Sequence, residues 1–290
     1  MKTILITGGN GFLGSNIVKS LIKNYKIIVL VRNTEKLFRL NSFLPKLKIY
    51  STITDDLESI FKDNSIDIIL HTATVYGRNE ETLNELLSTN LLLPLNLLQL
   101  GIQYNVSTFI NTDTVLKSNT NPYALSKSQL RNWLVIKSDK IKVINIQLEH
   151  FYGPGGSIDN FISWIILKFV ENEIEIDLTK GEQQRDFLYI DDVVSAFSTI
   201  INNLDLLIDN YVEIQVASNE VISIKDLVQL LKNLTGSKTI LNFGALPYRP
   251  NELMQLTTNN DKIKSLGWFP IISLEEGMKR TIKYIMNQSF

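Results

Sequence analysis

The chain contains no cysteine and only two histidines among its 290 residues. Without thiols it can form no disulfide, no thiolate metal site and no cysteine nucleophile. Two imidazoles, His71 and His150, argue against a histidine-rich metal site. We therefore expect a protein that binds no metal.

The sequence also lacks an excess of charge and a long apolar run. It has 29 basic and 30 acidic residues and a formal net charge of −1, so it lacks the basic footprint of nucleic-acid or anionic-membrane binding. Its most apolar stretch, Leu86–Leu100, is interrupted by polar residues and Pro94 and is too short to span a bilayer. The N-terminal apolar run meets glycines after six residues, unlike a secretory signal. We expect a soluble, cytoplasmic protein with no nucleic-acid or membrane partner.

Short apolar segments alternate with helical patterns through the first half of the chain. The sequence predicts strands at 2–7, 26–31, 66–71, 108–112 and 142–148, and helices at 12–24, 81–103 and 122–138. This alternation is typical of an α/β fold with a Rossmann-type, doubly wound parallel sheet. After residue 150 the elements become shorter, with helices expected near 158–172, 191–203 and 223–235. We predict a dinucleotide-binding domain over 1–150 with a returning segment near 186–203, and a smaller C-terminal α/β region over 151–290.

Three glycines, Gly8, Gly11 and Gly14, follow the first predicted strand and lead into the first helix. The first permits a tight turn, a later one lets the backbone approach a pyrophosphate, and the last allows close helix–strand packing. The helix N-terminus adds a favourable site for negative charge. The segment containing Gly8, Gly11, Phe12, Leu13 and Gly14 is therefore predicted to bind a nicotinamide dinucleotide.

The end of the second strand bears on the choice between NAD and NADP. An acidic residue there accepts hydrogen bonds from the ribose 2′-hydroxyl, whereas a basic one accommodates a 2′-phosphate. This sequence has Arg32 at that place and no acid. Arg32 therefore favours NADP(H), with NAD(H) as the alternative cofactor. Arg32 could alternatively be a solvated loop residue with no role in binding.

Tyr123 and Lys127 lie four residues apart on a predicted helix, which places both on one face. A free tyrosine ionises near pH 10, and a neighbouring ammonium favours the phenolate, so the pair suits proton transfer beside a hydride carrier. The polar strand end at 111–114 should supply a hydroxyl that binds the same substrate oxygen.

These motifs, together with others along most of the chain, resemble the extended short-chain dehydrogenases/reductases of the NAD(P)-dependent sugar-nucleotide epimerase/dehydratase family. The further motifs are His71-Thr72-Ala73-Thr74, Asn90, Tyr152-Gly153-Pro154, Arg185 to Val193, Arg249 with Glu252, and Leu266-Gly267-Trp268. The resemblance implies that the cofactor contacts Thr72, Ala73, Thr74 and Lys127, with Asp55 a weaker candidate for the adenine pocket.

The resemblance also implies a nucleoside-diphosphate sugar as substrate, bound mainly by the region 151–290. Arg185 and Arg249 match the family's diphosphate-binding arginines, although a surface ion pair is an alternative, especially for Arg249. Glu149 is expected either to face the sugar or to form a buried pair with His150. Counting from Phe109, the family's catalytic Ser or Thr corresponds to Thr114. Counting back from Val115, it corresponds to Thr112.

Enzymes of this family carry out one of three main reactions: 4,6-dehydration, 4-epimerisation or 4-keto reduction. Dehydratases of the family carry an Asp-Glu pair directly after the catalytic Thr. Those two places hold Val115 and Leu116 in one alignment and Asp113 and Thr114 in the other. The Glu is absent in both, so dehydration is disfavoured. The polar strand end, the short segment before Tyr123 and the Glu149-to-Pro154 motif are similar to CDP-abequose synthase-like 4-ketohexose reductases, which serve O-antigen and other surface-polysaccharide biosynthesis. The sequence therefore predicts NADPH-dependent reduction of a 4-keto-deoxyhexose. A 4-epimerase that retains NAD is the alternative, and a non-catalytic NADP sensor is a lesser one.

A homodimer is expected from the resemblance, through the helices near 81–103 and 122–138. The many leucines between 91 and 98 are consistent with burial on more than one helix face.

Overall fold

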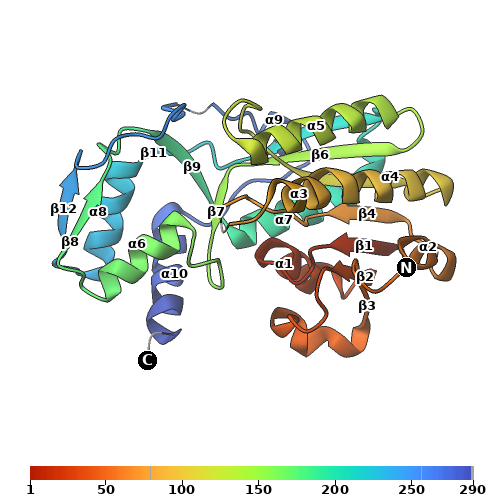
Figure 1. The fold of residues 1–290 in the computed structure, drawn as a ribbon, viewed down its shortest axis with the longest axis horizontal. Coiled ribbons are helices and arrows are strands. Elements are labelled where there is room, and N and C mark those ends of the chain that lie inside the picture. The colour runs from red at the N-terminus through yellow and green to blue at the C-terminus, as the bar shows by residue number, and fades with distance from the viewer. Residues whose placement is uncertain (79, 256, 289–290) are drawn as a thin grey trace. The chain divides into compact units, whose positions relative to one another are not determined.

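The structure is a computed structural model that describes residues 1–78, 80–255 and 257–288 (Figure 1). The chain forms two compact units. Unit 1 comprises residues 1–148 and 194–215, and unit 2 comprises residues 149–193 and 216–290. In the described part of the chain, no helix combines the length and apolarity needed to cross a membrane.

Unit 1 is built on a seven-stranded sheet with the order β10-β6-β5-β4-β1-β2-β3. The strands β1 to β6 pair in parallel, as predicted for a doubly wound sheet. Their bounds are β1 Thr3–Thr7, β2 Lys26–Val31, β3 Leu47–Ser51, β4 Ile68–His71, β5 Thr108–Thr114, β6 Lys142–Leu148 and β10 Tyr211–Val216. The strands β1 and β2 are almost wholly apolar because both faces of a parallel sheet are covered.

Helices cover both faces of this sheet. Apolar residues of α2 (Leu57–Asp63), α4 (Leu93–Gln103) and α5 (Pro122–Lys137) share one core cluster with Leu5, Ile28 and Leu30 of the sheet. Because side chains alternate along a strand, Val29 points to the other face, where it approaches α1 (Phe12–Leu21). Hydrogen bonds link α1 and the residues after it to α7 (Ile190–Asn202), so these helices lie side by side. Short 3-10 segments occur at Phe38–Lys46 and Leu204–Leu206.

Unit 2 contains two small sheets. One has the order β11-β9-β7, formed by Val221–Ser223, Gln184–Tyr189 and His150–Tyr152, and the other pairs β12 (Ile240–Phe243) with β8 (Glu175–Leu178). Its helices are α6 Phe161–Val170, α8 Ile224–Thr235, α9 Asp261–Lys264 and α10 Leu274–Gln288. The carboxylate of Asp192, in the first turn of α7, accepts hydrogen bonds from the backbone N–H groups of Ile271 and Ile272. This contact ties the start of α7 to the segment before α10.

The helical pattern predicted over 81–103 is confirmed for residues 83–103, which are helical without a break, although the middle turn is π-helical. The structure contains α3 (Leu83–Leu87), a π-helical turn (Ser88–Leu92) and then α4. Pro94 is one cause of the π-helical turn, because it has no N–H to donate to the carbonyl one turn earlier. The buried Asn90 is another, because its side chain bonds to the backbone of Val75 rather than facing solvent. The π-helical turn thereby anchors the loop that follows β4.

Candidate active site

The glycine turn is as tight as its sequence predicted. Gly8 has a φ of +64°, which favours glycine, and its N–H donates to the carbonyl of Leu30 at 2.9 Å. A Cβ on Gly14 would lie 2.3 Å from the carbonyl oxygen of Gly8, so only glycine lets α1 approach β1 this closely. Gly11 caps α1 without a side-chain hydrogen bond. The start of α1, including Phe12 and Leu13, therefore presents backbone N–H groups where an anion is favoured.

The ends of β2 and β3 carry the two residues expected near the adenosine. The Arg32 side chain is exposed, and its carbonyl accepts a hydrogen bond from the hydroxyl of Ser51 at 3.1 Å. Asp55 accepts a hydrogen bond from the backbone N–H of Ser51 at 2.6 Å. Asp55 thus closes the turn after β3, and Arg32 is available to a ligand.

The loop after β4 is held by two buried polar side chains. The hydroxyl of Thr7 accepts hydrogen bonds from the backbone N–H groups of Thr72 and Ala73, both at 3.1 Å. Asn90 contacts the hydroxyl of Thr74 at 3.3 Å and donates to Ser126 on α5 at 3.1 Å. The residues predicted to contact the cofactor are therefore fixed next to the helix that carries Tyr123.

Tyr123 and Lys127 of α5 lie next to the end of β5, which carries Thr112 and Thr114. The Nζ atom of Lys127 is buried and donates to the carbonyl of Thr112 at 2.9 Å. The Tyr123 side chain is hydrogen-bonded to that of Thr114. The Tyr123 ring also packs against the Tyr76 ring, with 4.9 Å between centroids.

The pKa values differ from the sequence expectation that Lys127 favours a phenolate. Burial, reinforced by the nearby Tyr76 and Asp113, raises the pKa of Tyr123 well above its usual value. Burial also lowers the pKa of Lys127 to about 8, although Asp113 partly opposes this. The Tyr123 phenol therefore keeps its proton at neutral pH and releases it less readily than a free tyrosine does.

The two threonines at the strand end are not equivalent. The hydroxyl of Thr114 contacts Tyr123 and accepts a hydrogen bond from the N–H of Leu116 at 3.2 Å. The buried hydroxyl of Thr112 has no hydrogen-bond partner. The geometry favours Thr114 over Thr112 as the hydroxyl that acts with Tyr123.

In unit 2, the guanidinium of Arg185 already has hydrogen-bond and ion-pair partners within the protein. Its guanidinium donates to the carbonyls of Gln184 and Leu253 and forms an ion pair with Glu252 at 2.5 Å. A diphosphate would therefore have to compete with Glu252 for this side chain. Arg249, by contrast, is exposed in the loop before Glu252.

Glu149 pairs with His150, which was one of its two expected roles, but only the Glu149 side chain is buried. One carboxylate oxygen accepts from the His150 ring at 2.5 Å, and the other is buried without a partner. The His150 side chain is about half exposed and packs on Phe187. Across the described residues, no group of three His, Cys, Asp or Glu side chains could hold a metal ion.

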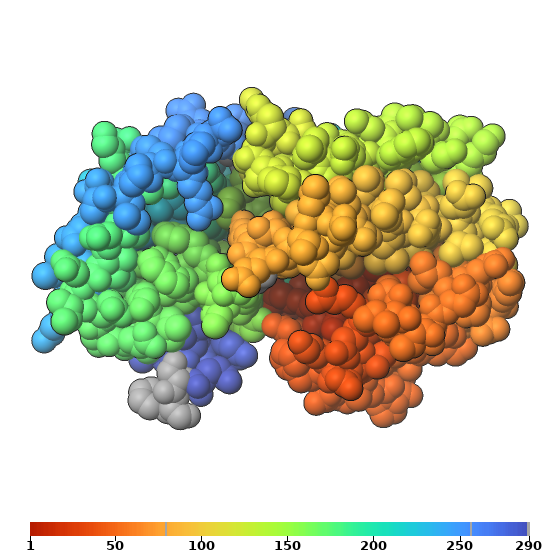
Figure 2. Space-filling model, in the orientation of Figure 1, coloured from red at the N-terminus to blue at the C-terminus, as the bar shows by residue number. Residues whose placement is uncertain are grey.

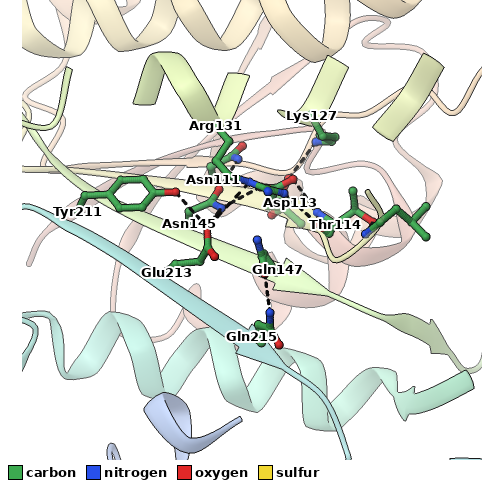
Figure 3. A network of polar contacts seen from close by, with 12 residues as sticks. Asn111, Asp113, Thr114, Lys127, Arg131, Asn145, Gln147, Tyr211, Glu213 and Gln215 are labelled. Carbon is green, nitrogen blue, oxygen red and sulfur yellow. Dashed lines mark hydrogen bonds and ion pairs between the residues drawn. The ribbon is translucent and has the colours of Figure 1, made fainter. Parts of the chain in front are cut away.

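Sequence reasoning missed a polar network beneath Thr114 (Figure 3). Asp113 lies between Arg131 of α5 and Asn145 of β6, at 2.6 and 2.8 Å. Asn145 also contacts Asn111 at 2.8 Å and Glu213 at 3.3 Å. The spacing of Arg131, four residues after Lys127, was the available signal.

Comparisons with known proteins agree on one family. The model of the NAD dependent epimerase/dehydratase family matches residues 4–212. CDP-abequose synthase of Salmonella typhimurium is 32% identical, with 97% of each chain covered. The structure of UDP-glucose 4-epimerase from Thermotoga maritima, with UDP-glucose, matches with a TM-score of 0.86 and 26% identity over 99% of this chain and 100% of the other. UDP-glucuronic acid 4-epimerase of Bacillus cereus, in complex with UDP-glucuronic acid and NAD, shares the fold at a TM-score of 0.87 and 22% identity over 99% and 100%.

Proposed function

This chain belongs to the NAD dependent epimerase/dehydratase family, and we propose that it uses NADPH to reduce the C4 ketone of a nucleoside-diphosphate 4-keto-deoxyhexose. Family membership makes it an NAD(P)-dependent enzyme acting on a nucleotide sugar. The observation that carries the proposal is the placement of Tyr123 beside Thr114 and of Lys127 against the end of β5, because a carbonyl reductase needs a proton donor and a hydroxyl at one substrate oxygen. The similarity to CDP-abequose synthase over 97% of both chains supports the choice of substrate class.

The residues present fit a dinucleotide, because the Gly8–Gly14 contact leaves room for backbone but for no side chain beside the start of α1. A bound nicotinamide dinucleotide supplies the hydride. Thr114 donates a hydrogen bond to the C4 oxygen, and Tyr123 transfers its phenolic proton to that oxygen as negative charge develops. The Lys127 ammonium, fixed by the carbonyl of Thr112, stabilises the phenolate that remains. Arg185, Arg249 and Glu149 are proposed to bind the nucleotide sugar.

Purified protein should oxidise NADPH in the presence of the correct 4-keto-6-deoxy sugar nucleotide. A panel of CDP-, dTDP-, GDP- and UDP-linked substrates, followed by the loss of NADPH absorbance with product stereochemistry read by NMR, identifies the base and the sugar. Failure of every substrate to support NADPH oxidation would overturn the proposed function.

A 4-epimerase is the second candidate, favoured by the 26% identity to UDP-glucose 4-epimerase over the whole chain. Such an enzyme would interconvert two C4 epimers without added reductant and would be purified with NAD bound. Incubation with UDP-glucose in the absence of NADPH tests this candidate directly.

Arg32 is proposed to bind the 2′-phosphate of NADPH. Its exposed guanidinium at the end of β2 can form a charge-assisted hydrogen bond, whose loss costs about 1.5–3 kcal/mol. Arg32→Ala should therefore raise the KM for NADPH by roughly 10- to 100-fold and leave the KM for NADH unchanged. Steady-state kinetics with both cofactors measure this. Arg39→Ala is the matched control, because Arg39 lies in the 3-10 segment that follows and stacks on the Phe38 ring. Equal losses in both variants, or a wild-type preference for NADH, would contradict the assignment.

We further propose that unit 1 forms a homodimer through α4 and α5, which are visible at the surface in Figure 2. Leu125, Trp133 and Ile136 of α5 share one helix face and are 47%, 47% and 63% exposed. An apolar face of this kind is unusual on a monomer surface. The double variant Trp133→Glu, Ile136→Glu should be monomeric in sedimentation velocity, with Lys140→Glu as the charge control. A monomeric wild type would contradict the proposal.

A further inference from the structure

Three residues of α5 are spaced four apart and face β5. Tyr123 contacts the hydroxyl of Thr114, Lys127 donates to the carbonyl of Thr112, and Arg131 donates to the carbonyl of Thr114 at 3.1 Å. Residues at i, i+4 and i+8 lie on one helix face, so a single face of α5 makes all three contacts. The first two belong to the proton-transfer site, and the third is unexplained by the function proposed above.

Asp113 binds both Arg131 and the residue that Arg131 contacts, Thr114. Its side chain is fully buried, and one carboxylate oxygen accepts the N–H of Thr114 at 2.7 Å. The other oxygen accepts from Arg131 at 2.6 Å and from Asn145 at 2.8 Å. The Asp113–Arg131 ion pair therefore binds both the N–H and the C=O of Thr114.

We propose that Asp113 and Arg131 are a positioning pair that fixes the backbone of Thr114 and so aims its hydroxyl at the substrate oxygen shared with Tyr123. The inference rests on the proposed function and deepens it. Thr114 is the last residue of β5, where strand pairing ends, so its orientation needs support from side chains. Figure 3 shows the pair directly beside Thr114 and Lys127.

A purely structural ion pair would need no contact with Thr114. A buried carboxylate requires partners in any case, and Asn145 and Arg131 would satisfy that need alone. The additional bonds to both polar groups of one residue are what a positioning role requires. Catalytic geometry is sensitive to such support, because a misplacement of about 1 Å can cost roughly 100-fold in rate.

The charge of Asp113 gives the pair a second, measurable effect. It raises the pKa of Tyr123 and opposes the effect of burial on the pKa of Lys127. The other titratable or charged groups around these residues are Tyr76 and Arg78 of the loop after β4, His71 of β4, Arg131 of α5, and Tyr211 and Glu213 of β10. Replacing Asp113 with a neutral isostere should lower the pKa of both Tyr123 and Lys127.

Asp113→Asn is the principal test. We expect kcat for NADPH-dependent reduction to fall by about 10- to 100-fold with KM for both substrates unchanged, and the alkaline limb of the kcat profile to move to lower pH. Glu213→Gln is the matched control, because Glu213 also contacts Asn145 and lies near Arg131 but does not touch Thr114. An unchanged kcat and pH profile in folded Asp113→Asn, or the same changes in Glu213→Gln, would overturn the inference.

A second measurement needs no sugar substrate. Tyrosinate absorbance is titrated in NADP⁺ complexes of the wild type and Asp113→Asn, each minus its Tyr123→Phe counterpart, so that only Tyr123 is seen. A lower pKa of Tyr123 in Asp113→Asn would show that the charge of Asp113 acts on Tyr123 even if no 4-keto sugar is reduced, and an unchanged pKa would contradict that effect of the pair. If Asp113→Asn does not fold, Arg131→Lys is the alternative variant. It keeps the positive charge, but a single ammonium replaces the two guanidinium nitrogens that bind Asp113 and the carbonyl of Thr114. Its kcat should fall with KM unchanged, and wild-type kcat in this variant would overturn the inference.

Discussion

Tyr123→Phe is expected to lower kcat for the reduction by about 10²- to 10⁴-fold, the usual contribution of a positioned general acid. The variant loses only the phenolic oxygen. Its ring can still pack against Tyr76 at the wild-type position, so the fold and the affinities for NADPH and the nucleotide sugar should be retained. Stopped-flow rates with saturating substrates, together with equilibrium binding of NADPH, separate the two effects.

Tyr76→Phe serves as the control, since it removes a hydroxyl from the ring next to Tyr123 and should retain most of the activity. If Tyr123→Phe kept wild-type kcat, a different residue would be the acid. The roles proposed for Thr114 and Lys127, which depend on Tyr123, would then be contradicted as well.

Gly14→Ala is expected to abolish measurable dinucleotide binding and to lower the melting temperature. A Cβ at this position would lie 2.3 Å from the Gly8 carbonyl oxygen and 2.8 Å from the Gly9 Cα, and backbone cannot move aside as a flexible side chain can. Either α1 shifts away from the glycine turn or the turn itself opens. Overpacking of this kind typically costs about 1–3 kcal/mol in stability. NADPH titration by fluorescence and thermal unfolding measure the two losses.

Gly11→Ala is the graded control for this experiment. Gly11 has extended backbone angles that any residue can adopt, and a methyl group added there would meet only the Gly8 carbonyl, at 3.1 Å. Its binding should weaken much less. Equal binding by Gly14→Ala and the wild type would show that the turn does not hold the cofactor in the manner proposed.

The features that could be predicted from sequence are those set by local pattern. The glycine turn is a run of seven residues, and Tyr123 and Lys127 lie one helical turn apart, so spacing alone places them. The buried strands β1 and β2 were recognisable from unbroken apolar runs, and β6 from an apolar run interrupted only by Asn145 and Gln147. By contrast, β3 and the short strands of unit 2 were missed. The residues of β3 range from exposed to buried, so the strand has no continuous apolar run, and three- or four-residue strands carry little periodicity.

The features that could not be predicted depend on contacts between distant residues. Arg185 pairs with Glu252, 67 residues away, and nothing in the local sequence of either residue specifies the other. In the sequence, Asp113 is one polar residue among several at a strand end. Its contacts with Arg131 and Asn145 exist only in the folded chain, so its role could not be predicted. The pKa of Tyr123 belongs to this class as well, since it is raised by burial and by the nearby Tyr76 and Asp113.

The central claim, net hydride transfer to C4, is tested most directly with NADPH carrying deuterium at C4 of the nicotinamide. The two stereospecifically labelled cofactors are each incubated with the wild-type protein and a 4-keto-6-deoxy sugar nucleotide, and the product is analysed by NMR. We predict that one of the two labels appears at C4 of the sugar, with one NADPH oxidised for each product formed. Interconversion of C4 epimers with no NADPH oxidised and no deuterium in the sugar would contradict the claim and identify an epimerase.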